Sequence, residues 1–276
     1  MTPRSIKSAE RTLALFEVFS QREEGLTVGQ VVRELGIPQP SASMLLRNLA
    51  DLGYLEYDRR QRLFAPTIRV MLLGSWINRR FSEAGSIPER LLELQAHCRG
   101  ETVYVGVQNG AAMQYIVSLE ADRPDRLKVT SGMFRSLTCS APGRALLSLK
   151  TNSEVAGWVR RCNAEAAEER LKVREGDYLQ LIERVRAQGY GESDGDVTPG
   201  SGAFAVTIRS PLGEMPLAIG CGGPMTRVRR QRDRIVEGLM AIRQAYGHPA
   251  EEPVSRTAYV APAPGADGLA GRLKPR

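Results

Sequence analysis

A glycine between two short amphipathic helices constrains the fold of this chain more than any other feature of the sequence. Thr27 and Gln30 have the spacing of a capping box, which marks the start of a helix. Gly36 stands at the left-handed position at which helices commonly end. A second helix is predicted to begin near Pro40, because proline suits the first turn of a helix, and to end at Gly53. Two helices joined by so short a turn indicate a helix-turn-helix.

The flanking segments extend this motif to a small domain. An amphipathic helix is predicted from Ser8 onward, and residues 54–57 and 63–65 alternate like two short strands joined by a basic turn. The predicted apolar faces of the three helices comprise Leu13, Phe16 and Phe19, then Val28, Val31, Val32 and Leu35, then Leu45, Leu46, Leu49 and Leu52. Helix, helix, tight turn, helix and basic hairpin is the order of a winged helix-turn-helix, a DNA-binding domain.

The second helix of such a motif enters the major groove, so its outward side chains are the candidates for contacts with base edges and phosphates. These side chains are Gln39, Ser41, Ser43, Met44, Arg47 and Asn48. Basic residues suited to backbone phosphates or an adjacent minor groove are Arg59, Arg60 and Arg62 of the hairpin, with Arg4, Lys7 and Arg11 near the N-terminus. The alternative is a small helical domain that mediates protein contacts and carries an arginine-rich hairpin for solubility.

The charge distribution is consistent with a polyanion partner. The 276 residues, enough for two domains, have a net charge of +7. Residues 1–80 contain 12 Lys and Arg against 8 Asp and Glu, and residues 256–276 contain 4 against 1, whereas the middle of the chain is neutral. An incidental surface imbalance explains the same numbers, so charge alone does not decide the partner.

Several classes of protein are disfavoured. There is no apolar run of the roughly 20 residues that a membrane span needs, and residues 1–10 do not resemble a signal peptide, so we expect a cytoplasmic protein. The four scattered cysteines predict free thiols, and with His97 and His248 as the only imidazoles we expect neither a metal site nor a cofactor. The glycine-rich stretches lack the spacing of a dinucleotide fingerprint or a P-loop, and no G-x-S-x-G elbow occurs.

The rest of the chain predicts a second domain with an α/β (α+β) fold and a largely antiparallel sheet. Asn109 and Gly110 between two strand-like runs are a strong hairpin signal. The expected elements are a linker helix from Ile68 to Phe81 with Val70, Leu73, Trp76 and Ile77 on its apolar side, helices at 88–99, 140–161, 176–188 and 226–246, and strands at 102–107, 112–118, 203–209 and 215–222. The domain boundaries that we predict are 1–67, 68–84 and 85–247, followed by a disordered tail at 248–276.

The sequence resembles the IclR family of bacterial transcription regulators. The resemblance lies in the segments 8–13, 25–27, 35–38 and 45–49 and, further on, in 132–147 and 189–190. It implies a winged helix, a linker helix and a GAF-like effector-binding domain, in a protein that is a dimer or a tetramer built from dimers. The recognition helix of relatives usually opens Lys-Ser-Thr and carries an Arg ahead of paired leucines. Here Gln39, Pro40, Ser41 and Met44 occupy these positions, so we expect affinity to depend more on the hairpin and on Arg47.

The resemblance also implies a small-molecule effector, often an organic or aromatic acid of a catabolic pathway. The residues that match effector-lining positions are Leu137, Ala141, Pro142, Asp194, Ser201, Ala203, Gly220 and Gly222. Backbone N–H groups at the helix start near Ala141 can receive a carboxylate, although Pro142 removes one donor. The alternatives are that the small residues only pack strands closely, that Asp194 is a solvated loop carboxylate, and that the second domain is an enzyme or a protein-interaction module on a GAF-like scaffold.

Overall fold

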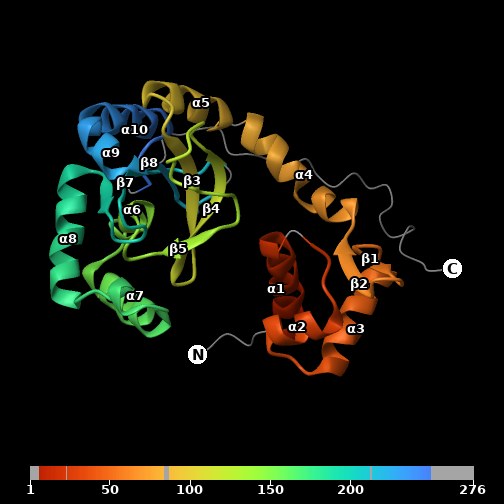
Figure 1. The fold of residues 1–276 in the computed structure, drawn as a ribbon. Helices are drawn as coiled ribbons and strands as arrows, with labels where there is room; N and C mark the ends of the chain where they lie inside the picture. The colour runs from red at the N-terminus through yellow and green to blue at the C-terminus, as the bar shows by residue number, and fades with distance from the viewer. Residues whose placement is uncertain (1–5, 23, 84–86, 212, 250–276) are drawn as a thin grey trace, which may run out of the picture.

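The N-terminal region of the computed structural model is a winged helix-turn-helix (Figure 1). The structure describes residues 6–22, 24–83, 87–211 and 213–249, so Arg4 and most of the predicted tail lie outside it. The elements of this region are α1 (Lys7–Arg22), α2 (Val28–Leu35), α3 (Gln39–Asp51), β1 (Leu55–Asp58) and β2 (Leu63–Pro66). The two strands pair antiparallel, and an isolated bridge joins Leu26 to Phe64. The predicted order of elements is confirmed.

The boundaries of α2 follow from its capping residues. The hydroxyl of Thr27 accepts a hydrogen bond from the backbone N–H of Gln30 at 3.3 Å, and the Gln30 amide oxygen accepts from the Thr27 N–H at 2.7 Å. Gly36 ends the helix with φ 60°. The capping box and the left-handed glycine are therefore confirmed, and together they set the short turn to α3.

Two of the predicted core positions are wrong. Leu13 is 66% exposed and Leu52 is 54% exposed, whereas Leu15 and Leu46 are fully buried. Leu15 and Phe19 are one helical turn apart, and Leu13 lies about 200° around the helix from Leu15, on the opposite face. Leu52 follows the end of α3, so the apolar face of that helix does not include it.

The second region is a six-stranded antiparallel sheet with helices on both faces (Figure 1). The strands are β3 (Thr102–Asn109), β4 (Ala112–Leu119), β5 (Phe134–Ser136), β6 (Gly191–Asp194), β7 (Ser201–Ile208) and β8 (Leu217–Pro224), in the order β5-β4-β3-β8-β7-β6. Its helices are α5 (Ile87–His97), α6 (Ala141–Leu147), α7 (Asn152–Glu165), η1 (Glu169–Leu171), α8 (Glu175–Gln188), α9 (Met225–Arg230) and α10 (Arg232–Tyr246). The helix α4 (Ile68–Glu83) precedes them and connects β2 to α5. The α+β fold with an antiparallel sheet is confirmed.

Each face of the sheet has its own core. Val103 and Val105 of β3 pack with α5 and α10, whereas Tyr104 between them faces the core formed with α6, α7 and α8. This alternation is the ordinary consequence of the strand period of two. Ala203 and Ala205 of β7 form a cluster of small side chains with α6, which lets this helix approach the sheet closely.

Three details of the second region differ from the sequence prediction. The helix predicted over 140–161 is two helices, because Thr151 forms a capping box with Glu154 and starts α7. The helix predicted over 226–246 is also interrupted, at Gln231 between α9 and α10. The short strands β5 and β6 were not predicted, since three or four residues provide too little alternation.

Within the described ranges, no helix combines the length and the apolar character needed to cross a membrane. All four cysteines are buried free thiols. The described His, Cys, Asp and Glu residues form no group of three or more that could hold a metal ion.

Candidate DNA interface and effector pocket

The outward face of α3 presents the predicted recognition residues to solvent. Gln39, Met44, Arg47 and Asn48 are exposed, whereas Ser41 and Ser43 are half-buried. Met44 is the most notable of them, because its apolar side chain is 70% exposed. A methionine there can pack on a thymine methyl group, and the polar neighbours can bond to base edges.

The hairpin between β1 and β2, which we call the wing, is held by one carboxylate. Oδ1 of Asp58 accepts hydrogen bonds from the backbone N–H groups of Arg60 at 2.7 Å and Gln61 at 3.1 Å. Arg62 closes the turn with φ 56°. The side chains of Arg59, Arg60 and Arg62 are exposed, and none forms an ion pair with a described residue. Three unpaired cations on one narrow turn suit a polyanion.

Of the basic residues near the N-terminus, Lys7 is exposed and Arg11 is half-buried, both on α1. The start of α4 is fastened to the end of α3. Nη1 of Arg69 donates to the carbonyl of Leu52 at 2.7 Å, and its guanidinium lies 4.9 Å from the ring centre of Tyr54. The linker helix is thus connected directly to the helix that would meet DNA.

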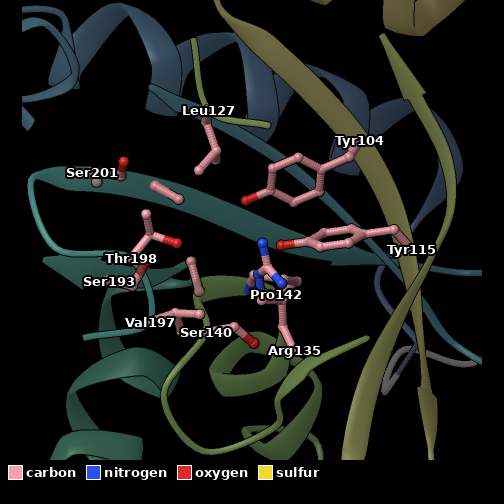
Figure 2. A pocket seen from close by; sticks show the side chains of 13 residues that line it. Tyr104, Tyr115, Leu127, Arg135, Ser140, Pro142, Ser193, Val197, Thr198 and Ser201 are labelled. Atoms are coloured by element: carbon pink, nitrogen blue, oxygen red, sulfur yellow. The ribbon is translucent and has the colours of Figure 1, made fainter. Parts of the chain in front are cut away.

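A pocket lies on the face of the sheet opposite α5 and α10, next to the start of α6 (Figure 2). Its empty volume is about 360 Å³, part of it open to solvent. The thirteen lining residues are Tyr104, Tyr115, Leu127, Arg135, Ser140, Ala141, Pro142, Ser193, Val197, Thr198, Ser201, Gly202 and Ala203. Aromatic and aliphatic walls with a few polar groups are typical of small-molecule sites.

Two tyrosines form the sheet side of the pocket. The rings of Tyr104 and Tyr115 meet edge to face at 4.7 Å between centres. A β-bulge between Val105 and Gly106 brings Tyr115 to the same face as Tyr104. Burial raises the pKa of Tyr115 to about 12 and that of Tyr104 well above its ordinary value, so both phenols are protonated at neutral pH. The Tyr104 hydroxyl is buried without a hydrogen-bond partner among the described residues.

The tyrosine wall depends on a glycine in the neighbouring strand. Gly220 of β8 pairs with Tyr104 of β3, and the Tyr104 ring lies across it. A Cβ atom at Gly220 would come within 2.4 Å of the ring carbon Cε2. Gly222 plays the same part for Leu127, whose Cδ2 would lie 2.7 Å from an added Cβ.

Arg135 is the one charged residue in the lining of the pocket. It is half-buried on β5, and its Nη1 bonds only weakly, at 3.3 Å, to the carbonyl of Phe134. Figure 2 shows its guanidinium directed toward the same part of the pocket as the hydroxyl groups of Tyr104 and Tyr115.

The start of α6 offers fewer donors than the sequence suggested. Ser140 is the N-cap, and its hydroxyl already accepts from the N–H of Gly143 at 3.2 Å. Pro142 has no N–H, so only the N–H of Ala141 is left in the first three positions. With seven residues, α6 also has only a small dipole.

The residues 193–200, which we call the pocket loop, close the side of the pocket opposite the tyrosines. Arg170 holds the backbone of the loop, since it donates to the carbonyls of Asp196 and Val197 at 3.2 and 3.1 Å. Arg144 holds the residue just before the loop, since it donates to the carbonyl of Glu192 at 2.6 Å. Arg144 also pairs with the Asp196 carboxylate at 3.1 Å.

The pocket brings together four of the predicted effector residues, namely Ala141, Pro142, Ser201 and Ala203. The other four lie nearby. Leu137 is fully buried in the core, Asp194 pairs with Arg229, and Gly220 and Gly222 lie beneath lining side chains. A direct effector contact by these four stays a prediction.

Nine further lining residues were not predicted from the sequence, namely Tyr104, Tyr115, Leu127, Arg135, Ser140, Ser193, Val197, Thr198 and Gly202. A signal existed for Tyr104, since it is a tyrosine between two valines of a strand-like run. No sequence signal indicated Arg135, because β5 itself was not predicted.

Known proteins match both regions of the chain. The model of the IclR helix-turn-helix domain matches residues 8–59, and that of the C-terminal domain of bacterial transcriptional regulator IclR matches residues 86–246. The regulator BhcR of Paracoccus denitrificans is 24% identical over 245 residues, covering 86% of each chain. The repressor AllR of Salmonella typhi is 26% identical over 229 residues, covering 82% of this chain and 83% of its own. An IclR homologue from Microbacterium hydrocarbonoxydans, solved in complex with 4-hydroxybenzoate, has the same fold with a TM-score of 0.64, at 16% identity and covering 86% of this chain and 99% of its own.

A winged helix-turn-helix and an α+β domain that are joined by a helix and match the two IclR family models define a DNA-binding transcription regulator with an effector-binding domain. The two family models together match well over half of the chain. The chain belongs to the IclR family of bacterial transcriptional regulators.

Proposed function

We propose that this regulator binds its operator as a dimer through α3 and the wing, and that a small organic acid in the pocket sets its affinity for DNA. The observation that carries the DNA assignment is the group of three exposed, unpaired arginines at the wing, beside an exposed recognition face. In this proposal Arg59, Arg60 and Arg62 neutralise phosphates, and Lys7 with Arg4 and Arg11 adds to them.

Base recognition is assigned to the outward residues of α3. Arg47 is suited to guanine and Gln39 or Asn48 to adenine, whereas Met44 packs against a thymine methyl group. The half-buried Ser41 and Ser43 are closer to the helix body and suit phosphate or base contacts.

The dimer assignment rests on the linker helix. Ile68, Met71, Leu72 and Leu73 of α4 are between 55% and 69% exposed. Four large apolar side chains on one short helix segment are costly to leave in water, and a second copy of the helix would cover them. Tetramers would require a further contact between dimers.

The effector assignment rests on the pocket. The homologue complexed with 4-hydroxybenzoate supports an aromatic or other organic acid as the ligand class. Arg69 joins the start of α4 to the end of α3, so a shift of the linker helix reaches the recognition helix. The change in DNA affinity can be no larger than the preference of the effector for one conformation. The effector is released unchanged, which distinguishes this protein from an enzyme on the same scaffold.

Fluorescence anisotropy tests the DNA assignment. The titration uses purified protein and a labelled duplex from upstream of its own coding sequence, with a scrambled duplex as control, across a salt series. We expect preference for the native duplex and a steep loss of affinity with salt. Replacing Arg59, Arg60 and Arg62 by Gln should flatten the slope of log K against log salt by about 2.7 per protomer, at about 0.9 for each phosphate contact.

The matched control replaces three exposed arginines of the second domain, Arg160, Arg161 and Arg174, by Gln. It removes the same charge but should keep the wild-type slope. An unchanged slope in the wing variant would overturn the wing assignment. Absence of binding to either duplex, with and without candidate acids, would favour a protein-interaction module, and turnover of a bound acid would favour an enzyme.

A further inference from the structure

We propose that Arg135 binds the carboxylate of the effector and that the hydroxyl of Tyr104 bonds to a second oxygen of the same molecule. The ligand class is thereby narrowed to small carboxylic acids that also carry a hydroxyl or carbonyl group. This inference rests on the proposed function, because it assigns contacts within the proposed effector pocket.

The lining of the pocket is positively charged. Among its thirteen lining residues Arg135 is the one cation, and none is an Asp or Glu. The carboxylates of the neighbouring pocket loop are already engaged: Asp194 pairs with Arg229, and Asp196 pairs with Arg144 and accepts from the Asp194 N–H. No ion pair between described residues includes Arg135. The pocket therefore presents an uncompensated positive charge.

The side chain of Arg135 lies on the same face of the sheet as Tyr115 and has unused hydrogen-bond donors. Arg135 of β5 stands opposite Met113 of β4, so its side chain shares a face with Met113 and with Tyr115 two residues further along. Its one hydrogen bond is the long contact with the Phe134 carbonyl. A half-buried guanidinium with unused donors is suited to the paired oxygens of a carboxylate.

The Tyr104 hydroxyl is a second polar group of the pocket and supports the proposal independently of Arg135. It is fully buried, it points into the pocket in Figure 2, and it has no partner among the described residues. A buried hydroxyl left unpaired is costly, so an oxygen supplied by the ligand would be favoured there. Burial keeps this phenol protonated, and it can therefore donate to that oxygen.

The walls between these groups set the remaining chemistry. Leu127, Pro142 and Val197 supply apolar surface, and the Tyr104 and Tyr115 rings supply aromatic edges and faces. A compact carbon skeleton, aromatic or aliphatic, fits between Arg135 and the Tyr104 hydroxyl. A ligand with a positive charge would be repelled by Arg135.

Isothermal titration calorimetry without DNA tests the proposal. The probes are acids with their neutral amides: 4-hydroxybenzoate, benzoate and glycolate, against 4-hydroxybenzamide, benzamide and glycolamide. For the wild type we expect at least one acid to bind about 10- to 100-fold more tightly than its amide, which is the range of a charge-assisted hydrogen bond. In Arg135→Gln this preference should disappear, and Arg135→Lys should restore part of it.

Tyr104→Phe tests the second contact. It should reduce the advantage of 4-hydroxybenzoate over benzoate, or abolish the binding of glycolate, while the preference for acids over amides persists. Lys128→Gln is the matched control, since it removes an exposed cation next to Leu127 that does not line the pocket. This control should bind the probes as the wild type does.

The proposal is overturned if Arg135→Gln keeps the preference for acids, if amides bind the wild type as tightly as acids, or if no acid of the panel binds the wild type. Failure of the proposed function would have a different signature, because it would show as absence of specific DNA binding by the wild type in the anisotropy titration. Circular dichroism of each variant establishes that the fold is retained.

Discussion

The substitution Gly220→Ala tests the central packing contact of the pocket. Gly220 lies in β8 and is not among the glycines with positive φ, so its backbone conformation accepts alanine. Elsewhere such a change stabilises by about 0.4–1 kcal/mol, because alanine restricts the unfolded chain. Here the added Cβ would lie 2.4 Å from Cε2 of Tyr104, while ordinary contacts begin near 3.4 Å. The ring must therefore retreat by about 1 Å.

The magnitude follows from the surroundings of Tyr104. The ring is fully buried and touches Tyr115, so it cannot move without displacing its neighbours. Overpacking of this kind costs about 1–3 kcal/mol. We expect the free energy of unfolding to fall by that amount, and the Tyr104 hydroxyl to move with the ring, so that effector affinity falls as well.

Urea unfolding followed by tryptophan fluorescence, from Trp76 and Trp158, measures the effect. The control is Gly157→Ala in the helix α7, where an added Cβ meets nothing within 4 Å, so this variant should gain roughly 0.5–1 kcal/mol. A double-mutant cycle with Tyr104→Ala isolates the contact, since Gly220→Ala should cost almost nothing once the ring is gone. If Gly220→Ala matches or exceeds the wild type in stability, the reasoning is refuted.

Three further predictions concern caps, ionisation and the linker. Thr27→Ala should lower the stability of the DNA-binding domain by about 1 kcal/mol, measured as a lower urea midpoint, because the capping box is lost; an unchanged midpoint would contradict this. The raised pKa of Tyr115 means that its stabilising contribution is complete below pH 10 and is lost as the pH rises toward about 12. Wild-type minus Tyr115→Phe absorbance at 295 nm should show that late step, and a step near pH 10 would refute the burial argument. Replacing Leu72 and Leu73 by Gln should weaken the dimer, and sedimentation at several concentrations would reveal an unaffected assembly if α4 is not the interface.

The elements with strong local signals were predictable from the sequence. The capping box at Thr27, the glycine at position 36 and the Asn109-Gly110 hairpin each determine backbone geometry within a few residues, and each has its predicted place. Signals that depend on a wider context were less informative. Leu13 has the character of a core residue, and only the packing of α1 against its neighbours shows that the buried face contains Leu15 instead.

The candidate DNA-binding residues depend on local sequence signals, whereas the pocket residues depend on contacts between distant segments. The candidate recognition residues lie within one helix and one hairpin, so helical periodicity placed those of the helix on an outward face and the turn between two strands placed the arginines. The pocket is assembled from β3, β4, β5, β7, the start of α6 and the pocket loop. Arg135 and Tyr104 line the same pocket because their strands each pair with β4, and neither periodicity nor composition specifies that register.

The way in which the pocket loop is held has a consequence for how this protein can evolve. Arg144 and Arg170 bind the carbonyl groups of Glu192, Asp196 and Val197, and the Asp196 carboxylate also pairs with Arg144. The position of the loop therefore depends on these backbone groups and on Asp196, and little on the side chains of Val197 and Thr198. Substitutions at Val197 or its neighbour Thr198 would change the ligand-facing surface while the backbone stays anchored. Under the proposed function, a lineage can therefore acquire a new effector through one or two changes in this loop while the fold around it is kept.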